Sequence, residues 1–147
     1  MTPLDLTHGP PRSPREELCE VCMLPRMIDI ARAKLPGGDV GQYQIGRGMS
    51  GLVLSAFGLS AERFVEMVRD AGTDADVAMA LGRRVAVARR AVGARLGRVT
   101  VADVPADLKE SFQQFYGADL PSDRLVFDVL EADDRKMFPD HKAKEAS

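Results

Sequence analysis

Apolar residues recur every three or four positions along most of this chain, which is the spacing of one face of an α-helix. The clearest stretch is residues 24–35, LPRMIDIARAKL, in which one apolar stripe consists of Leu24, Met27, Ile28, Ala31 and Leu35. Pro25 predicts a kink or break just before this helix, because proline has no N–H to donate and disfavours helical angles at the preceding residue. We therefore expect residues 24–35 to form a central helix that packs against several others.

Capping residues, prolines and glycines divide the rest of the sequence into further short helices. Ser13 and Pro14 are typical of a helix start and predict a short helix that runs to about residue 23. A buried helix is expected at 52–57, and residues 77–99 continue the helical spacing. Further helices are expected after the following caps or breaks: Ser60, Thr73, Pro105 and Ser122. The predicted fold class is all-α, a single compact irregular bundle of about six to seven short helices.

The length and composition indicate one globular domain. With 147 residues, of which 45% are hydrophobic and 29% charged, the chain can bury a core without disulfides or a structural metal. We expect an extended Pro-rich N-terminal arm at 1–12, a single helical domain at 13–138 and a polar C-terminal tail at 139–147. Neither an internal repeat nor a second domain is evident.

The charge and the absence of targeting signals argue against nucleic-acid binding, membrane association and secretion. The formal net charge of −2 gives no global field that would attract nucleic acid or a membrane surface, and the low aromatic content of 5% weakens any mechanism based on base stacking. The N-terminus lacks the basic and apolar regions of a signal peptide, and the longest uncharged run, 48–61, is too short to span a bilayer. A reducing, cytoplasmic compartment fits best, and no cofactor is expected.

A row of charged residues lies off the apolar stripe of the central helix. Arg26, Asp29 and Arg32 are spaced three apart, so their side chains can meet along the helix. One interpretation is a core helix with a solvated row of charges, because exposed ion pairs are common and weak. The other is that this row lines a pocket that binds an anion or a partner carboxylate.

Three segments together resemble one uncharacterised bacterial family. They are Asp5-Leu6-Thr7 with the following PPRSPRE at 10–16, LPRMIDIARAKL at 24–35, and the helix boundary Phe57-Gly58-Leu59. This combination is similar to domain of unknown function 5069. The resemblance implies a compact, mainly helical domain of about this length, and it implies no activity and no catalytic residues.

Cys19 and Cys22 form a C-x-x-C motif. If this segment is helical, the two thiols share a face and are candidates for a redox pair or a metal site. Helical peroxidases of the alkylhydroperoxidase D type place a histidine four residues after the second cysteine, whereas Arg26 stands there in this chain. A zinc site would need two more ligands, and the only histidines, His8 and His141, lie near the chain ends. Buried structural cysteines are therefore the preferred interpretation, and no metal site is predicted.

Residues 46–51, GRGMSG, match the G-x-G-x-x-G pattern of nucleotide-binding loops. That mechanism needs a strand before the loop and a βαβ unit around it, and no such unit is predicted here. A narrower hypothesis is that the loop ends in a helix N-terminus whose free N–H groups, together with Arg47, hold an anion.

The most unusual charge feature is a run of arginines without an acid from residue 77 to residue 102. On a helical wheel an arc of roughly 140° contains all of them except Arg89: Arg83, Arg84, Arg90, Arg95 and Arg98. The preferred interpretation is a solvated face that pairs with acids of this chain or of a neighbouring copy, such as those on the last helix: Asp128, Glu131, Asp133 and Asp134. The alternatives are an acidic protein partner or a phosphate backbone.

The sequence favours a small cytoplasmic helical protein that acts as a binding or interaction module, with a protein partner or a second copy as its ligand. A different class of function is an enzyme for a small ligand or a thiol reaction, centred on Cys19, Cys22 and Arg26. A third hypothesis is a nucleic-acid accessory protein that uses the basic face from Arg83 to Arg98; the charge balance disfavours it.

Overall fold

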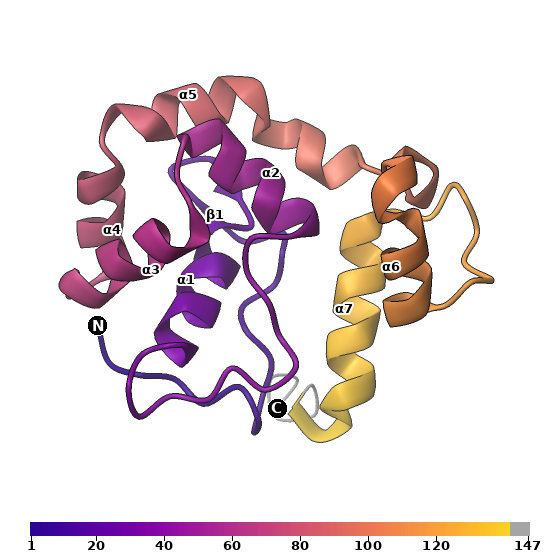
Figure 1. Ribbon diagram of the computed structural model, residues 1–147, viewed down its shortest axis with the longest axis horizontal. Coiled ribbons are helices and arrows are strands. Elements are labelled where there is room, and N and C mark those ends of the chain that lie inside the picture. The colour runs from indigo at the N-terminus through magenta and orange to yellow at the C-terminus, as the bar shows by residue number, and fades with distance from the viewer. Residues whose placement is uncertain (142–147) are drawn as a thin grey trace. The chain divides into compact units, whose positions relative to one another are not determined.

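A computed structural model describes residues 1–141 of the chain (Figure 1). The described residues are mostly helical, and their only sheet is a hairpin of two short strands. This confirms the predicted helical class. Backbone contacts group the chain into two compact units, residues 1–94 and residues 95–147. The expected single helical domain at 13–138 stays a prediction.

The first unit contains a β-hairpin where the sequence predicted a helix. Strands β1 (Glu17–Leu18) and β2 (Val21–Cys22) pair antiparallel, so the helix expected at 13–23 is wrong. Ser13 caps a single turn, in which its hydroxyl accepts from the Arg15 N–H, and the chain then leaves helical geometry. The Met23 N–H donates to the Pro14 carbonyl at 3.0 Å, a long-range bond that a continuous helix would not allow. Tertiary pairing therefore overrides the local start signal.

The central helix is confirmed as α1 (Leu24–Ala33), with Pro25 in its first turn. Met27, Ile28 and Ala31 are completely buried, and α1 contacts α3 and the hairpin. Every residue of α1 except Arg32 is buried. The reason is that the N-terminal arm also covers this helix: the Leu4 N–H donates to the Arg32 carbonyl, and the arm exchanges backbone hydrogen bonds with Asp39.

Three further helices of the first unit begin or end at residues whose local chemistry explains them. Helix α2 (Gly48–Phe57) ends at Gly58, which adopts a left-handed conformation (φ 68°). Helix α3 (Ala61–Asp70) begins at Ser60, whose hydroxyl accepts from a backbone N–H, and α4 (Asp74–Leu81) begins with a capping box between Thr73 and Asp76. The helix starts predicted at Ser60 and Thr73 are therefore confirmed.

The helical pattern at 77–99 is split by two glycines. Gly82 (φ 56°, ψ −126°) separates α4 from α5 (Arg83–Ala91), and Gly93, also at positive φ, lies at the start of the 3-10 helix η1 (Gly93–Arg98). Helix α5 contacts α2 within the first unit. A single helix along 77–98 is therefore absent, because positive φ values at Gly82 and Gly93 interrupt the helical backbone, the second of them within the arginine run.

The second unit contains η2 (Val101–Asp103), α6 (Ala106–Tyr116) and α7 (Val126–Met137). An antiparallel bridge between Thr100 and Leu125 joins the segment before η2 to the start of α7, and the Ala102 N–H donates to the Ser122 carbonyl. The residue that precedes α7 is Leu125, so the cap predicted at Ser122 is wrong. A long loop connects α6 to α7 (Figure 1). Of the expected polar tail, residues 142–147 lie outside the described residues.

Candidate functional site

The charged row of α1 is part of an ion-pair network that holds the N-terminal arm. Arg12 lies in the arm, and its guanidinium donates to Asp29 on α1 (Nη2 to Oδ1, 3.0 Å) and to Asp74 at the start of α4 (Nη1 to Oδ2, 2.6 Å). Its backbone N–H donates to Asp29 Oδ2 at 2.8 Å. Hydrogen bonding to Asp74 raises the pKa of Arg12 above its already high value. The carboxylate of Asp29, which is nearly buried, is thus paired with a guanidinium of the same chain.

Arg26 is buried beside this network. Only 4% of the residue is exposed, its Nη1 donates to the Arg12 carbonyl at 3.3 Å, and its guanidinium carbon lies 5.4 Å from the centre of the Tyr43 ring. Stacking on an aromatic face is a favourable environment for a guanidinium. Arg26 therefore links the arm and the 41–47 loop to α1, a structural role, and its side chain is enclosed by protein groups.

The other two anion-site candidates, Arg32 and Arg47, have different surroundings. Arg32 donates to the Thr2 carbonyl at 2.8 Å and lies 4.0 Å from Asp29, so it also fastens the arm. Arg47 is exposed at the N-terminus of α2, where the Ser50 hydroxyl accepts from the Gly46 N–H and donates to the Arg47 carbonyl. The helix N-terminus expected after Gly46 is therefore present, and Ser50 satisfies part of the loop's hydrogen bonding.

Sequence reasoning found Arg26, Asp29 and Arg32 but missed Arg12 and Asp74, which extend the row into a network with the N-terminal arm and the start of α4. Arg12 is 17 residues from Asp29 and 62 residues from Asp74. No periodicity relates such distant positions, so a single sequence contains no signal for this pairing.

The hairpin separates the two thiols of the C-x-x-C motif. Cys19 is exposed in the turn and Cys22 is buried on β2, and both are free. Burial, followed by the hydrogen bond from its Sγ to Glu17 Oε1 (3.5 Å), raises the pKa of Cys22. A raised thiol pKa lowers the fraction of nucleophilic thiolate at neutral pH. Cys19 and Glu20 adopt φ values of 52° and 62°, which the two-residue turn requires and which are uncommon for such residues.

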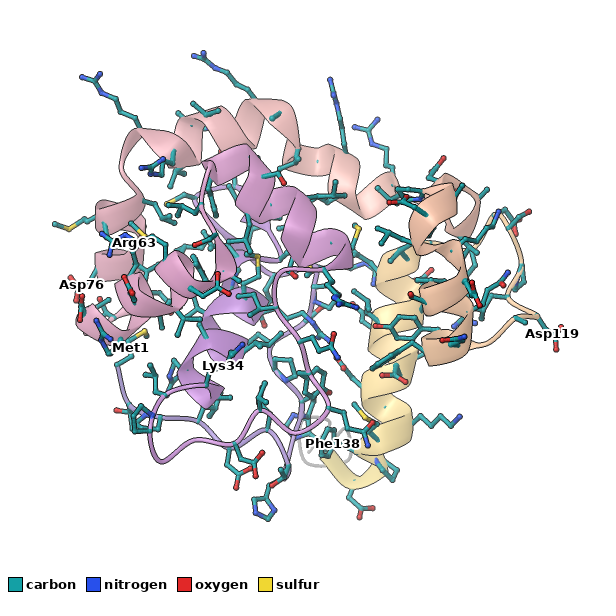
Figure 2. All side chains as sticks on the ribbon, viewed as in Figure 1. Met1, Lys34, Arg63, Asp76, Asp119 and Phe138 are labelled. Carbon is teal, nitrogen blue, oxygen red and sulfur yellow. The ribbon has the colours of Figure 1, made fainter. Side chains whose placement is uncertain are left out.

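The arginines of α5 divide into two pairs with different surroundings. Arg84 and Arg89 lie on the flanks of the helix: Arg84 Nη1 donates to the Phe57 carbonyl at the end of α2 (3.0 Å), and Arg89 Nη1 contacts Glu20 Oε2 (3.4 Å). Arg83 and Arg90, seven residues apart, lie opposite the buried Val85 and Ala88. Figure 2 shows long side chains that end in nitrogen standing away from the ribbon of α5.

Four arginines of the predicted basic face have no partner in the described part of the chain: Arg83, Arg90, Arg95 and Arg98. The last two belong to the second unit, where both are exposed on η1. The four acids expected to balance them, Asp128, Glu131, Asp133 and Asp134, make interactions with other groups. Within the described part of the second unit, Arg95 and Arg98 form no ion pair with these acids, and the pairing predicted for Arg83 and Arg90 stays a prediction.

A comparison with protein families decides the affiliation of the chain. The model of the family described as Domain of unknown function (DUF5069) matches residues 8–136, which is most of the sequence. The chain belongs to this family. No curated protein sequence matches it.

The DUF5069 match includes both units and all the helices from α1 to α6. Across residues 1–141 of this DUF5069 protein, no helix has the length and apolar character needed to cross a membrane. The same residues contain no group of three or more His, Cys, Asp or Glu side chains placed to hold a metal ion.

Proposed function

We propose that this DUF5069 protein is an interaction module that binds an acidic segment of a partner protein through the outer face of α5. We define this face by Arg83, Val87 and Arg90. The observation that supports the proposal most directly is that both arginines are exposed and have no partner among the described residues. A helical rise of 1.5 Å per residue places them about 10.5 Å apart along the axis. That spacing matches two carboxylates seven residues apart on a partner helix.

The apolar residue between the arginines favours a protein over a simple anion. Val87 is 56% exposed, so the outer face offers an apolar contact flanked by two cations. Arginine is enriched at protein interfaces, because its planar guanidinium pairs with carboxylates in a bidentate manner and packs against apolar groups. An amphipathic acidic helix offers both kinds of contact.

The same face is a poor match for nucleic acid. Proteins that bind duplex DNA tightly contact about 6–10 phosphates, whereas the outer face has two unpaired arginines and no aromatic residue for stacking. The whole chain carries a net charge of −2, so long-range attraction to a polyanion is weak. We predict that binding to duplex DNA is weak and non-specific.

The thiol alternative has less support. Cys22 is buried with a raised pKa, Cys19 is exposed in the turn, and Arg26 is enclosed by Arg12 and Tyr43. These surroundings favour structural roles for Cys22 and Arg26. A cytoplasmic location is part of the proposal, because free thiols are maintained in a reducing compartment.

Fluorescence anisotropy with labelled probes tests the proposal. The main probe is an amphipathic peptide of about 20 residues that consists of Glu and Leu at helical spacing. A polyglutamate peptide lacks the apolar contact, a Lys/Leu peptide reverses the charge, and a labelled DNA duplex represents the nucleic-acid hypothesis. We expect the Glu/Leu peptide to bind most tightly and the double variant Arg83→Glu/Arg90→Glu to weaken it by about tenfold or more.

The matched control is Arg63→Glu/Arg69→Glu, which changes the net charge equally on α3, away from the outer face (Arg63 is labelled in Figure 2). It should leave peptide affinity within about twofold, and circular dichroism checks that both variants fold. Equal losses in the two double variants would show that only net charge matters. Submicromolar binding of the DNA duplex that depends on Arg83 and Arg90 would replace the proposal with the nucleic-acid hypothesis.

A further inference from the structure

Helix α2 packs beside α5 in the first unit, and the two helices run in opposite directions. Arg84, in the first turn of α5, donates to the carbonyl of Phe57, the last residue of α2. The start of α5 therefore lies beside the end of α2, and the two helices stay in contact, as Figure 1 shows. It follows that the second half of α5 lies beside the middle of α2.

Each of these two helices exposes one large apolar side chain. Leu52, in the middle of α2, is 47% exposed, and Val87, on the outer face of α5, is 56% exposed. Met79 on α4 is the only other exposed side chain of this kind in the described first unit. A single exposed apolar residue is ordinary, but two on neighbouring helices form a patch that a partner can cover.

Leu52 and Val87 both lie toward the junction of the two helices. Val87 follows Arg84 by three residues, so it shares the side of α5 from which Arg84 reaches α2. On α2, Met49 is buried and Ala56 is half-buried, and both share the side of Leu52. Leu52 thus borders the covered side of α2, and α5 is the element that α2 contacts most.

The surroundings of this apolar pair are basic. Arg83 and Arg90 lie on either side of Val87 along α5, and both are exposed without a partner in the described chain. Neither α2 nor α5 contains an acidic residue. Glu20 pairs with Arg89, on the flank of α5 opposite Arg84. The exposed surface of the two helices therefore complements a ligand that is both acidic and apolar.

We infer that Leu52 is a second apolar contact for the acidic partner, so that the binding surface spans α2 and α5. The inference rests on the proposed function and narrows its partner to an acidic helix with apolar residues on two adjacent turns. One apolar residue packs against Val87 and the other against Leu52, while flanking carboxylates pair with Arg83 and Arg90. Packed helices lie about 8–10 Å apart, and a helix with its side chains is about 10 Å wide, so one partner helix covers both contacts.

Fluorescence anisotropy with three labelled peptides of equal charge tests this inference. The first is a Glu/Leu peptide with leucines on two adjacent turns, the second has one of them replaced by alanine, and the third has both replaced. We expect Leu52→Ser to weaken the two-leucine peptide about fivefold, because binding removes the exposed half of this side chain from water. The peptide without leucine should stay within about twofold. Wild-type protein should prefer two leucines to one, and Leu52→Ser should lose most of that preference.

Two control variants separate an apolar contact from a change in the fold. Leu52→Met keeps an apolar side chain and should stay within about twofold of the wild-type affinity. Leu108→Ser removes a leucine of similar exposure, 39%, from α6 of the second unit and should also leave the affinity unchanged. Circular dichroism checks that each variant folds.

The outcomes distinguish this inference from the proposed function. If Leu52→Ser binds the two-leucine peptide as tightly as wild type, while Arg83→Glu/Arg90→Glu weakens it, the inference is overturned and the proposed function stands. An equal loss for the two-leucine peptide and the peptide without leucine, or an equal loss in Leu108→Ser, would also overturn the inference. If the two-leucine peptide does not bind the wild-type protein, the proposed function fails as well.

Discussion

The Arg12–Asp29 pair offers the sharpest test of how the first unit is held together. The substitution is Asp29→Asn, which preserves side-chain volume and removes the charge. Oδ1 accepts from Arg12 Nη2 (3.0 Å) and Nε (3.2 Å), while Oδ2 accepts from the Arg12 backbone N–H (2.8 Å). Whichever way an asparagine amide is turned, its NH₂ group faces an Arg12 donor. The variant therefore loses a charge-assisted bond and gains a donor–donor conflict.

The expected magnitude follows from burial. Breaking a buried ion pair by removing one partner costs about 3–5 kcal/mol. The Asp29 side chain is 8% exposed, but that of Arg12 is 32% exposed and keeps Asp74, so solvent screening and the remaining pair reduce the loss. We expect Asp29→Asn to lower the free energy of unfolding by about 2–4 kcal/mol.

The matched control is Asp70→Asn. Asp70 pairs with Arg69 at 3.2 Å, and both side chains are more than half exposed, so its loss should cost less than about 0.5 kcal/mol. Urea unfolding followed by circular dichroism measures both variants, and an unchanged dependence on urea shows that the same transition is compared. Hydrogen exchange at the Arg12 amide gives a local readout, because this N–H donates to Asp29.

Two results would refute the reasoning. A loss below about 1 kcal/mol for Asp29→Asn, with the Arg12 amide still protected, would mean that the arm is held by its backbone bonds and not by this network. An equal loss in Asp29→Asn and Asp70→Asn would mean that burial does not distinguish the two carboxylates.

Three further predictions concern the core, the thiols and α5. Ile28→Ala should cost about 2–5 kcal/mol in urea unfolding because the side chain is completely buried; a loss under about 1 kcal/mol would contradict its core role. A thiol reagent should modify the exposed Cys19 first and Cys22 only slowly, and the rate at Cys22 should rise only when the pH exceeds the ordinary pKa of a thiol. Rapid peroxide consumption that disappears in Cys22→Ser would instead show that the two thiols work as a redox pair. Arg84→Ala should lower the free energy of unfolding by about 1 kcal/mol, because it removes the hydrogen bond from Arg84 to the end of α2. Arg83→Ala should change this free energy by less than about 0.5 kcal/mol. Equal effects of the two substitutions would contradict the division of the α5 arginines between the flanks and the outer face.

Local chemistry determined the features that the sequence alone could predict. The central helix α1, the helix starts at Ser60 and Thr73 and the helix end at Gly58 all depend on contacts within a few residues. Periodicity, side-chain caps and the left-handed freedom of glycine act at that range. They were therefore visible without knowledge of the fold.

Tertiary structure decided the rest, because it depends on groups that are distant in sequence. The start signal at Ser13 is overridden by a hairpin whose edge bonds back to Pro14, and Gly82 rotates α5 out of register with α4. Arg12 reaches Asp29 and Asp74 across 17 and 62 residues, which joins the charged row of α1 to the arm and to α4 in a partly buried network. Tertiary structure also decided which arginines of α5 have a partner. A guanidinium is paired only where the folded chain places a carbonyl or carboxylate oxygen beside it, as it does for Arg84 and Arg89.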